Sequence, residues 1–188
     1  MAPKTKHRMY QLKVTPDEIQ PAIWRRILVR SDVTLYRLHL ILQVVMGWTD
    51  SHLHMFTIDG LDYGEPDPDF EDFGDDIADD QKTQLDQVVG REGMKFGYMY
   101  DFGDGWEHTI ELEKILPPQT LPRALCLEGA RACPPEDCGG VGGYEDLVKA
   151  MAKPRSKRYK ELVEWLGEAF QPEAFDLEVV NQELADFH

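Results

Sequence analysis

Residues 100–116, YDFGDGWEHTIELEKIL, constrain the fold more strongly than any other part of the sequence. The Asp-Gly pair at positions 104 and 105 is typical of a β-hairpin, because primed turns need positive φ. Apolar and polar residues alternate after this pair. Trp106, His108, Ile110 and Leu112 share one face, and the Glu and Thr residues between them share the other. The stretch therefore predicts a strand in a sheet with one buried and one wet face.

Four more strands and one central helix follow from the hydrophobic periodicity. Residues 8–14, 23–29, 52–58 and 95–101 have strand patterns, and residues 34–46 carry a helical apolar stripe. Thr34 is suited to cap that helix, and Gly47 is suited to end it. We expect an α+β fold, with a mixed, mostly antiparallel sheet of about five strands and a β-grasp-like first half.

The chain is predicted to be one domain, residues 1–188, with two distinct segments. Residues 65–86 are acidic and contain few large apolar side chains, which indicates a flexible, solvated loop. A cation-binding loop is the alternative, although the spaced acidic pattern of a calcium hand is missing. Residues 143–188 predict C-terminal helices at 144–152, at 157–170 and from Pro172 onward, packed on the sheet.

The formal net charge is −15, from 35 acidic and 20 basic residues. This charge opposes binding to phosphate backbones unless basic residues cluster. The basic residues that could form one such patch are Arg25, Arg26, Lys153, Arg155, Lys157 and Arg158. No apolar run is long enough to predict a membrane span. The start MAPKTKHRMY lacks the apolar core of a secretory signal, so we expect a cytoplasmic protein with reduced thiols.

Two histidines, His52 and His54, are separated by one residue in a predicted strand, so both rings are expected on one face. Histidines placed in this way can bind zinc or a similar divalent metal, or they can be core residues bonded to backbone. Around the hairpin, Asp101, Asp104 and His108 are candidates for catalysis, because a carboxylate that orients a histidine is a common general-base device. The alternative is a structural turn beside a core histidine. If the two strands are neighbours, His52, His54 and His108 could form one metal site.

Three cysteines form a second candidate metal set, with the pattern C-x6-C-x4-C at Cys126, Cys133 and Cys138. A closed zinc site needs four ligands, so His108, Asp137 or another histidine would have to complete it. Buried thiols and a redox-labile pair are the alternatives. Residues 139–143 hold four glycines around one valine, which favours a tight crossover into a helix over a phosphate-binding loop.

Several strings together resemble one known family. They are YQLKVTPDEIQPAIWRRILV, TLYRLHLILQVVMGWTDSHLHMF, YMYDFGDGWEHTIELEKIL and CLEGARACPPEDCGGVGGYEDL. In this order they are similar to the plasmid pRiA-type open-reading-frame-three-like family, whose members are also described as passenger proteins of insertion elements. The family's recurring motif positions correspond here to His52, His54, Asp101, Asp104, Trp106, His108, Cys133, Glu136, Asp137 and Cys138. The resemblance implies no established catalytic role for them.

Three functions are compatible with these observations. The first is a non-catalytic binding or interaction domain, with a protein partner or a cationic ligand and a link to mobile elements. The second is a metal-dependent hydrolase or nuclease that uses the three histidines together with Asp101 or Asp104. The third is a DNA-associated accessory protein, which the net charge opposes. The sequence favours the first function and indicates no substrate and no oligomeric state.

Overall fold

One mixed sheet forms the body of the protein. This computed structural model describes residues 7–65, 77–119 and 124–186. The sheet has eight strands in the order β5-β4-β3-β6-β7-β1-β2-β8. All neighbouring pairs are antiparallel except β4 and β5. The strands are β1 (His7–Pro16), β2 (Trp24–Arg30), β3 (His54–Ile58), β4 (Leu61–Gly64), β5 (Ala78–Asp79), β6 (Lys95–Tyr100), β7 (Trp106–Gln119) and β8 (Ala124–Ala130).

The α+β class is confirmed, but the prediction of about five strands is wrong. The turn at Asp59 and Gly60, where φ is 50° and 80°, joins β3 to β4. The same Asp-Gly signal predicts a two-residue turn at positions 104 and 105, but that prediction is wrong: the loop spans residues 101–105, and positive φ occurs at Asp101 and Gly105. Strand β8 lies in a proline-flanked segment without clear alternation, and it becomes a strand by pairing with β2. The predicted acidic loop, 65–86, includes β5 and the first two residues of the short helix α2 (Leu85–Val88). Its residues 66–76 lie outside the described part.

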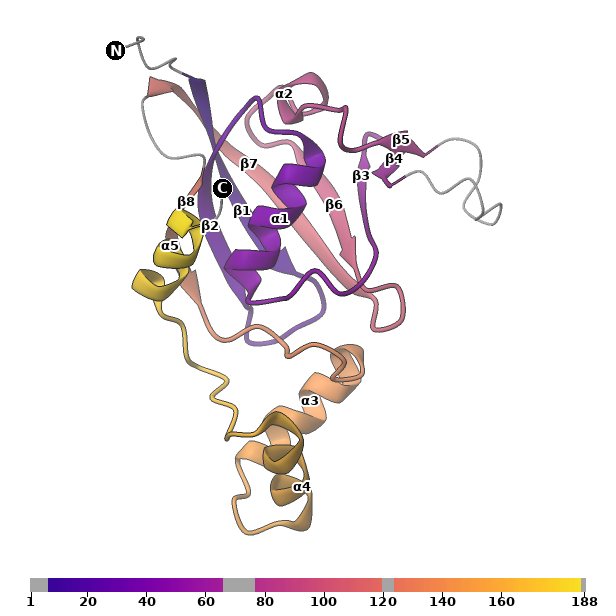
Figure 1. The fold of residues 1–188 in the computed structure, drawn as a ribbon, viewed down its shortest axis with the longest axis vertical. Coiled ribbons are helices and arrows are strands. Elements are labelled where there is room, and N and C mark those ends of the chain that lie inside the picture. The colour runs from indigo at the N-terminus through magenta and orange to yellow at the C-terminus, as the bar shows by residue number, and fades with distance from the viewer. Residues whose placement is uncertain (1–6, 66–76, 120–123, 187–188) are drawn as a thin grey trace.

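The buried face of the sheet is covered by helix α1 (Leu35–Met46), which lies across it in Figure 1. As predicted, the Thr34 hydroxyl accepts a hydrogen bond from the Arg37 amide, and Gly47 ends the helix at φ 79°. The predicted alternation in β7 is also confirmed. Trp106, His108 and the apolar residues in phase with them are buried, whereas Glu107 is exposed. The largest buried side chains belong to Trp106, Tyr98, Tyr100 and Phe56.

The C-terminal helices only partly follow the prediction that they pack on the sheet. Helix α5 (Leu177–Asp186) lies along β8, where the Asn181 amide bonds both backbone groups of Cys126. This contact covers a sheet edge that would otherwise be open to other strands. Helix α5 begins at Leu177 and not at Pro172, because Asp176 caps it by accepting from the amides of residues 178 and 179.

Helices α3 (Gly140–Met151) and α4 (Lys157–Leu166) form a hairpin that projects from the sheet (Figure 1). Tyr144 of α3 joins the main core. Leu147 and Ala150 instead pack with Leu162 of α4 in a separate cluster. Most of this hairpin is therefore stabilised by its own small core and not by the sheet.

Two neighbouring glycines of α3 should respond in opposite ways to alanine. A Cβ atom on Gly143 would lie 1.8 Å from the Cys138 carbonyl oxygen, whereas one on Gly142 would meet nothing within 4 Å. Gly142→Ala should stabilise the protein by up to about 1 kcal/mol, because alanine is the better helix former. Gly143→Ala should destabilise it by about 2 kcal/mol or more through steric overlap. Thermal unfolding of both variants checks this, and a higher melting temperature for Gly143→Ala would contradict it.

Candidate metal centre

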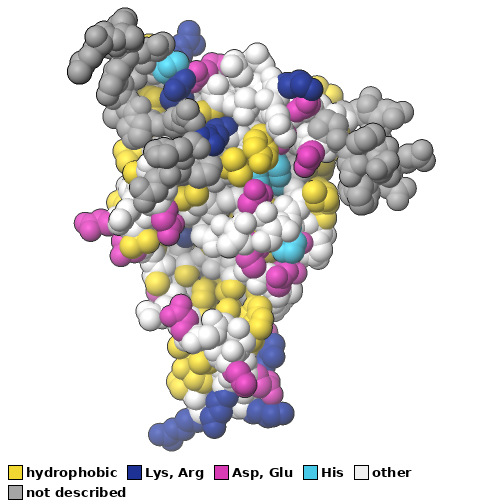
Figure 2. Space-filling view, viewed as in Figure 1, with side chains coloured by type: hydrophobic (Ala, Val, Ile, Leu, Met, Phe, Trp, Pro, Cys, Tyr) yellow, Lys and Arg dark blue, Asp and Glu magenta, His cyan; other side chains and the backbone are white. Residues whose placement is uncertain are grey.

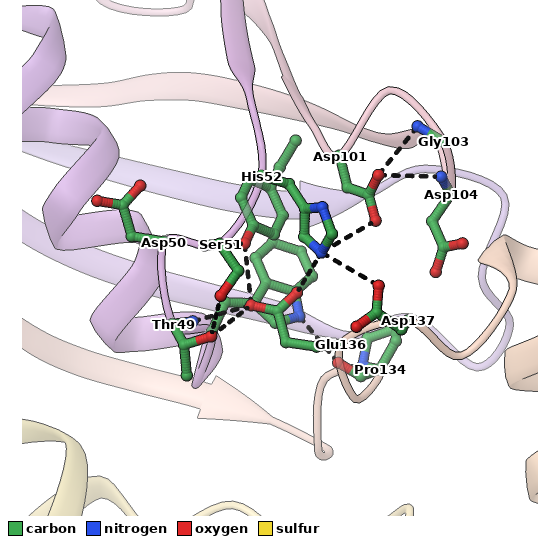
Figure 3. Close-up of polar contacts among 12 residues, drawn as sticks. Thr49, Asp50, Ser51, His52, Asp101, Gly103, Asp104, Pro134, Glu136 and Asp137 are labelled. Carbon is green, nitrogen blue, oxygen red and sulfur yellow. Dashed lines mark hydrogen bonds and ion pairs between the residues drawn. The ribbon is translucent and has the colours of Figure 1, made fainter.

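Three loops meet at the end of the sheet beside the start of α3. They are the connection from α1 to β3, the turn from β6 to β7, and the segment that leads into α3. Each loop contributes side chains to one polar cluster, which Figure 3 shows in close-up. His52 comes from the first loop, Asp101 from the second, and Glu136 and Asp137 from the third.

The His52 ring is the centre of this cluster. Its Nε2 atom lies 3.2 Å from Asp137 Oδ1, 3.7 Å from Asp101 Oδ2 and 3.9 Å from Glu136 Oε2. Despite these neighbours, Nε2 is buried and makes no hydrogen bond to any described residue. The imidazole nitrogen therefore faces three carboxylates without a directed partner.

Asp101 is fixed by its own turn. Its backbone is left-handed, with φ 55°, which Asp tolerates better than most residues. Its Oδ1 atom accepts hydrogen bonds from the amides of Gly103 and Asp104 at 2.9 and 3.2 Å. This Asx-type arrangement closes the turn. The other carboxylate oxygen, Oδ2, is left to face His52 (Figure 3).

Glu136 is held by one of its two oxygens. Oε1 accepts from the Tyr100 hydroxyl and the Thr49 amide, both at 2.9 Å, and from the Thr49 hydroxyl at 3.2 Å. Oε2 is buried and has no hydrogen-bond partner among the described residues. A buried acceptor without a partner costs on the order of 1–3 kcal/mol. The arrangement therefore directs one unsatisfied oxygen toward His52.

The cluster is strongly negative. Burial raises the pKa of the nearby Cys138 thiol to about 12, and the carboxylates of Asp104, Asp137 and Glu136 add to the rise. Tyr100 also has a raised pKa, first because of burial and then because of its bond to Glu136. Burial, the larger cause, disfavours a charge of either sign, whereas the smaller contribution of the carboxylates opposes an added anion in particular.

The spacing suits a metal ion. One ligand atom each from His52, Asp101 and Asp137 lie within 4.8 Å of one another, and this is the one group of that kind among the described residues. Ligands about 2.1 Å from a tetrahedral ion lie about 3.4 Å apart. The distances of 3.2 and 3.7 Å around His52 bracket that value. Glu136 Oε2, at 3.9 Å, could join them after a small shift.

The predicted pairing of His52 with His54 does not occur, because β3 begins only at His54. The chain before it turns at Asp50, where φ is 54°, so His52 points toward the β6–β7 turn. His54 lies elsewhere, bonded through Nε2 to Asp80 Oδ2 at 2.8 Å. Its ring stacks on that of His39, with centroids 3.5 Å apart. His39 in turn contacts Asp50 at 2.7 Å.

His108 and Asp104, the other hairpin candidates, lie outside the cluster. His108 is 1% exposed, and its Nδ1 is 2.9 Å from the Trp106 carbonyl oxygen. It packs edge-on against Trp48, and its Nε2 has no partner among the described residues. Asp104 accepts a hydrogen bond from the Gly139 amide at 3.0 Å and so ties the turn to the start of α3. The structure thus brings Asp101, but neither His108 nor Asp104, to His52.

The three cysteines do not form a ligand set within the described residues. Cys126 contacts backbone carbonyls of its own sheet region, and Cys133 contacts Met46 Sδ and the Arg25 guanidinium. All three are free thiols. Burial raises the pKa of Cys133 to about 11 and that of Cys126 in the same direction. Among the described residues no cysteine belongs to a group whose ligand atoms lie close enough together to share a metal ion.

The sequence pattern associates Asp137 with the cysteines and gives no indication of His39 or Asp80, which contact Asp50 and His54 in the structure. The family resemblance did name Glu136 and Asp137 as motif positions. The pattern C-P-P-E-D-C holds two adjacent acids in a proline- and glycine-rich loop, and such loops often position functional side chains. That signal could have identified the pair, but nothing in it gives the distance to His52.

Fold and site together define an α+β domain with a candidate metal centre at the junction of three loops. The family model described as "Plasmid pRiA4b ORF-3-like protein" matches residues 8–179, and the chain belongs to this family. The uncharacterised protein y4hQ of Sinorhizobium fredii is 42% identical over 158 residues, which cover 84% of this chain and 80% of that protein.

A crystal structure of a protein of unknown function from Methanosarcina mazei has the same fold. Its TM-score is 0.80 at 36% sequence identity, and the match covers 93% of this chain and 98% of that one. These relatives carry no assigned activity. Among the residues that the structure describes, no helix is long and apolar enough to cross a membrane.

The buried histidines should make the protein less stable in mild acid. Burial lowers the pKa of His108 from 6.5 to about 4, and burial and the adjacent His54 lower that of His39 to about 4. Between pH 6.5 and 4 the unfolded chain therefore binds more protons than the native one, so stability falls as pH falls. His108→Leu removes one of these groups. Between pH 7 and 5 it should lose about 2 kcal/mol less stability than the unaltered protein.

Denaturant unfolding at both pH values measures this difference. Comparing the change with pH within each protein separates the titration from any packing effect of leucine. An identical loss of stability in the two proteins would show that His108 does not titrate as its burial requires.

Proposed function

We propose that the protein is a binding domain whose ligand is a divalent metal ion held by His52, Asp101 and Asp137. The observation that carries this proposal is the convergence of three ligand atoms within 4.8 Å, from three separate loops. The unpartnered Nε2 of His52 and Oε2 of Glu136 support it, because one cation would satisfy both buried atoms.

The donor set favours an ion that accepts both nitrogen and oxygen. One imidazole and two or three carboxylates suit zinc and manganese, whereas calcium and magnesium prefer oxygen alone. Among the described residues no thiol lies in the ligand group. We expect zinc or manganese to bind more tightly than calcium at this site.

Removing a ligand should abolish metal binding without unfolding the protein. Asp137→Asn removes one negative charge from a side chain that is 72% exposed. The metal-free variant should melt at the same temperature as the unaltered protein or higher, because repulsion among the carboxylates is reduced. Added zinc or manganese should raise the melting temperature of the unaltered protein only, since a ligand at 100 times its Kd stabilises the native state by about 2.7 kcal/mol. Calorimetric titration and elemental analysis give the stoichiometry.

The matched control is His7→Ala, which removes a histidine that lies 2.9 Å from Asp32, outside the cluster. This control should keep one equivalent of metal, whereas His52→Ala should lose it. A protein that binds no divalent ion, or a His52→Ala variant that binds as well as the control, would refute the proposal.

A metal-dependent hydrolase is the second candidate function. Two observations favour it: Asp137 is exposed, and the ligand group contains three residues. Catalytic metal sites commonly have three protein ligands and keep one coordination position open for water. Of the residues that the sequence suggested for this role, His52 and Asp101 meet, while His54, His108 and Asp104 are occupied elsewhere. A hydrolase would therefore use a different set, completed by Asp137 and Glu136.

A phosphodiesterase assay separates these two candidates. With an activated aryl phosphodiester and manganese or zinc, a hydrolase should turn over at a rate that Asp137→Asn lowers at least about a hundredfold, since a well-placed metal supplies several kcal/mol. A non-catalytic binding domain should bind the ion and show no turnover above that of the free ion. Equal rates for Asp137→Asn and the unaltered protein would exclude catalysis by this centre.

An interaction with a protein partner and a link to mobile elements remain compatible with metal binding. The word plasmid comes from the description of the family model, and it identifies no residue of this chain that would contact a partner.

The DNA-associated function, as the sequence suggested it, required Arg25 and Arg26 to join the basic residues near position 155. Arg25 is 3% exposed and bonds the Val45 carbonyl, and Arg26 is bound to Glu113 and Glu128. These two arginines therefore do not supply free positive charge.

A further inference from the structure

The loop between α3 and α4, with the helix ends beside it, carries a concentrated positive charge. Residues 147–160 contain six basic and no acidic residues, so all 35 acidic residues of this −15 chain lie elsewhere. We call this segment the basic tip. Figure 2 shows Lys and Arg side chains gathered at the far end of the helical hairpin. The six residues are Lys149, Lys153, Arg155, Lys157, Arg158 and Lys160.

Part of this charge has no counterion in the described structure. Lys149 pairs with Glu145, Lys157 with Glu161, and Arg158 with Asp146. Lys153, Arg155 and Lys160 are exposed, and no ion pair joins them to a described carboxylate. Three positive charges therefore face solvent together.

Helix stability accounts for some of these charges, because Lys149 lies in the last turn of α3 and pairs with Glu145, but it does not account for the basic start of α4. Helix α4 begins with Lys157 and Arg158 and has no acidic residue in its first turn. Basic residues at a helix N-terminus oppose the macrodipole and cost a few tenths of a kcal/mol each. The N-terminus of α4 adds its own partial positive charge to the tip.

The acidic body does not cancel the tip at physiological salt. Helix α3 has 12 residues, so it extends about 18 Å from the metal centre toward the tip. The Debye length is about 8–10 Å in 0.1–0.15 M salt, so fields from charges farther away are largely screened. A polyanion that meets the protein at the tip first experiences the local positive charge.

We propose that the basic tip is a binding surface for the phosphate backbone of nucleic acid. Phosphate groups repeat regularly along a nucleic acid strand. Clustered Lys and Arg side chains bind them without contacting the bases. Arg155 offers a planar guanidinium for bidentate phosphate contacts, and the two lysines offer point charges beside it. The tip lies at the end of a hairpin that projects from the sheet (Figures 1 and 2), which allows a duplex to approach it away from the sheet. This surface is independent of the metal centre.

The test uses the full-length protein and a short, fluorescently labelled duplex of random sequence, in the presence of a chelator. Anisotropy titrations should give a Kd in the micromolar range at about 0.05–0.1 M salt. The affinity should fall with salt with a slope of about −3 on logarithmic axes if three cations contact phosphates. The triple variant Lys153→Glu, Arg155→Glu and Lys160→Glu should lose binding at least about a hundredfold.

The matched control changes the net charge equally at another place. Arg91→Glu, Lys95→Glu and Lys114→Glu alter three exposed residues around β6 and β7. This control should lower the affinity only slightly. Undetectable binding by the unaltered protein, or an equal loss in both triple variants, would overturn the proposal.

Acidic surfaces of a second copy could also meet the tip. Sedimentation of the unaltered protein and of the tip variant detects this case. A dimer that the tip substitutions dissociate, in a protein that does not bind the duplex, would assign the tip to self-association and overturn the nucleic-acid proposal. Chelation keeps this result separate from the metal proposal, because no arm of the experiment needs an ion.

Discussion

The stacking of Trp48 on Tyr100 connects the core of the protein to its polar cluster. The rings lie 4.8 Å apart, between the end of α1 and the last residue of β6. Each of the two side chains also donates one hydrogen bond to the segment before α3. The Trp48 indole donates to the Pro134 carbonyl at 2.9 Å, and the Tyr100 hydroxyl donates to Glu136 at 2.9 Å. One aromatic pair thus packs the sheet and positions the segment that carries two acidic site residues.

Two carboxylates of the cluster are each positioned by hydrogen bonds to one of their oxygens. Asp101 uses one oxygen to close its turn, and Glu136 uses one oxygen on Thr49 and Tyr100. The other oxygens are left to face His52, where they repel one another. Packing and backbone bonds therefore offset a local electrostatic cost, which is the arrangement expected where a protein preorganises ligands for a cation.

The sequence predicted features that depend on neighbours along the chain. The limits of α1, the alternation of β7 and the α+β class were correct because capping residues and periodicity act locally. The candidate site was harder. His52 and Asp101 were named, but with the wrong companions, because β3 begins at His54 and not at residue 52, which leaves His52 in the preceding loop. Asp137 could be placed beside His52 only by knowing how the segment before α3 folds back, and no local pattern encodes that path.

The hydrogen-bond partners of the histidines show why residue type alone does not identify the candidate site. His39 and His54 are stacked in the interior, and each has a carboxylate within 2.8 Å. Both Nε2 atoms therefore have a carboxylate partner, and His39 Nδ1 contacts the Tyr98 hydroxyl, although Asp80 Oδ1 has no partner among the described residues. His52 has more carboxylates around it but no hydrogen bond from Nε2 within the described structure. The Nε2 atom of the core histidine His108 is also unpartnered, but no ion pair joins it to a described carboxylate. The carboxylates around an unsatisfied nitrogen therefore distinguish His52 as the candidate metal ligand.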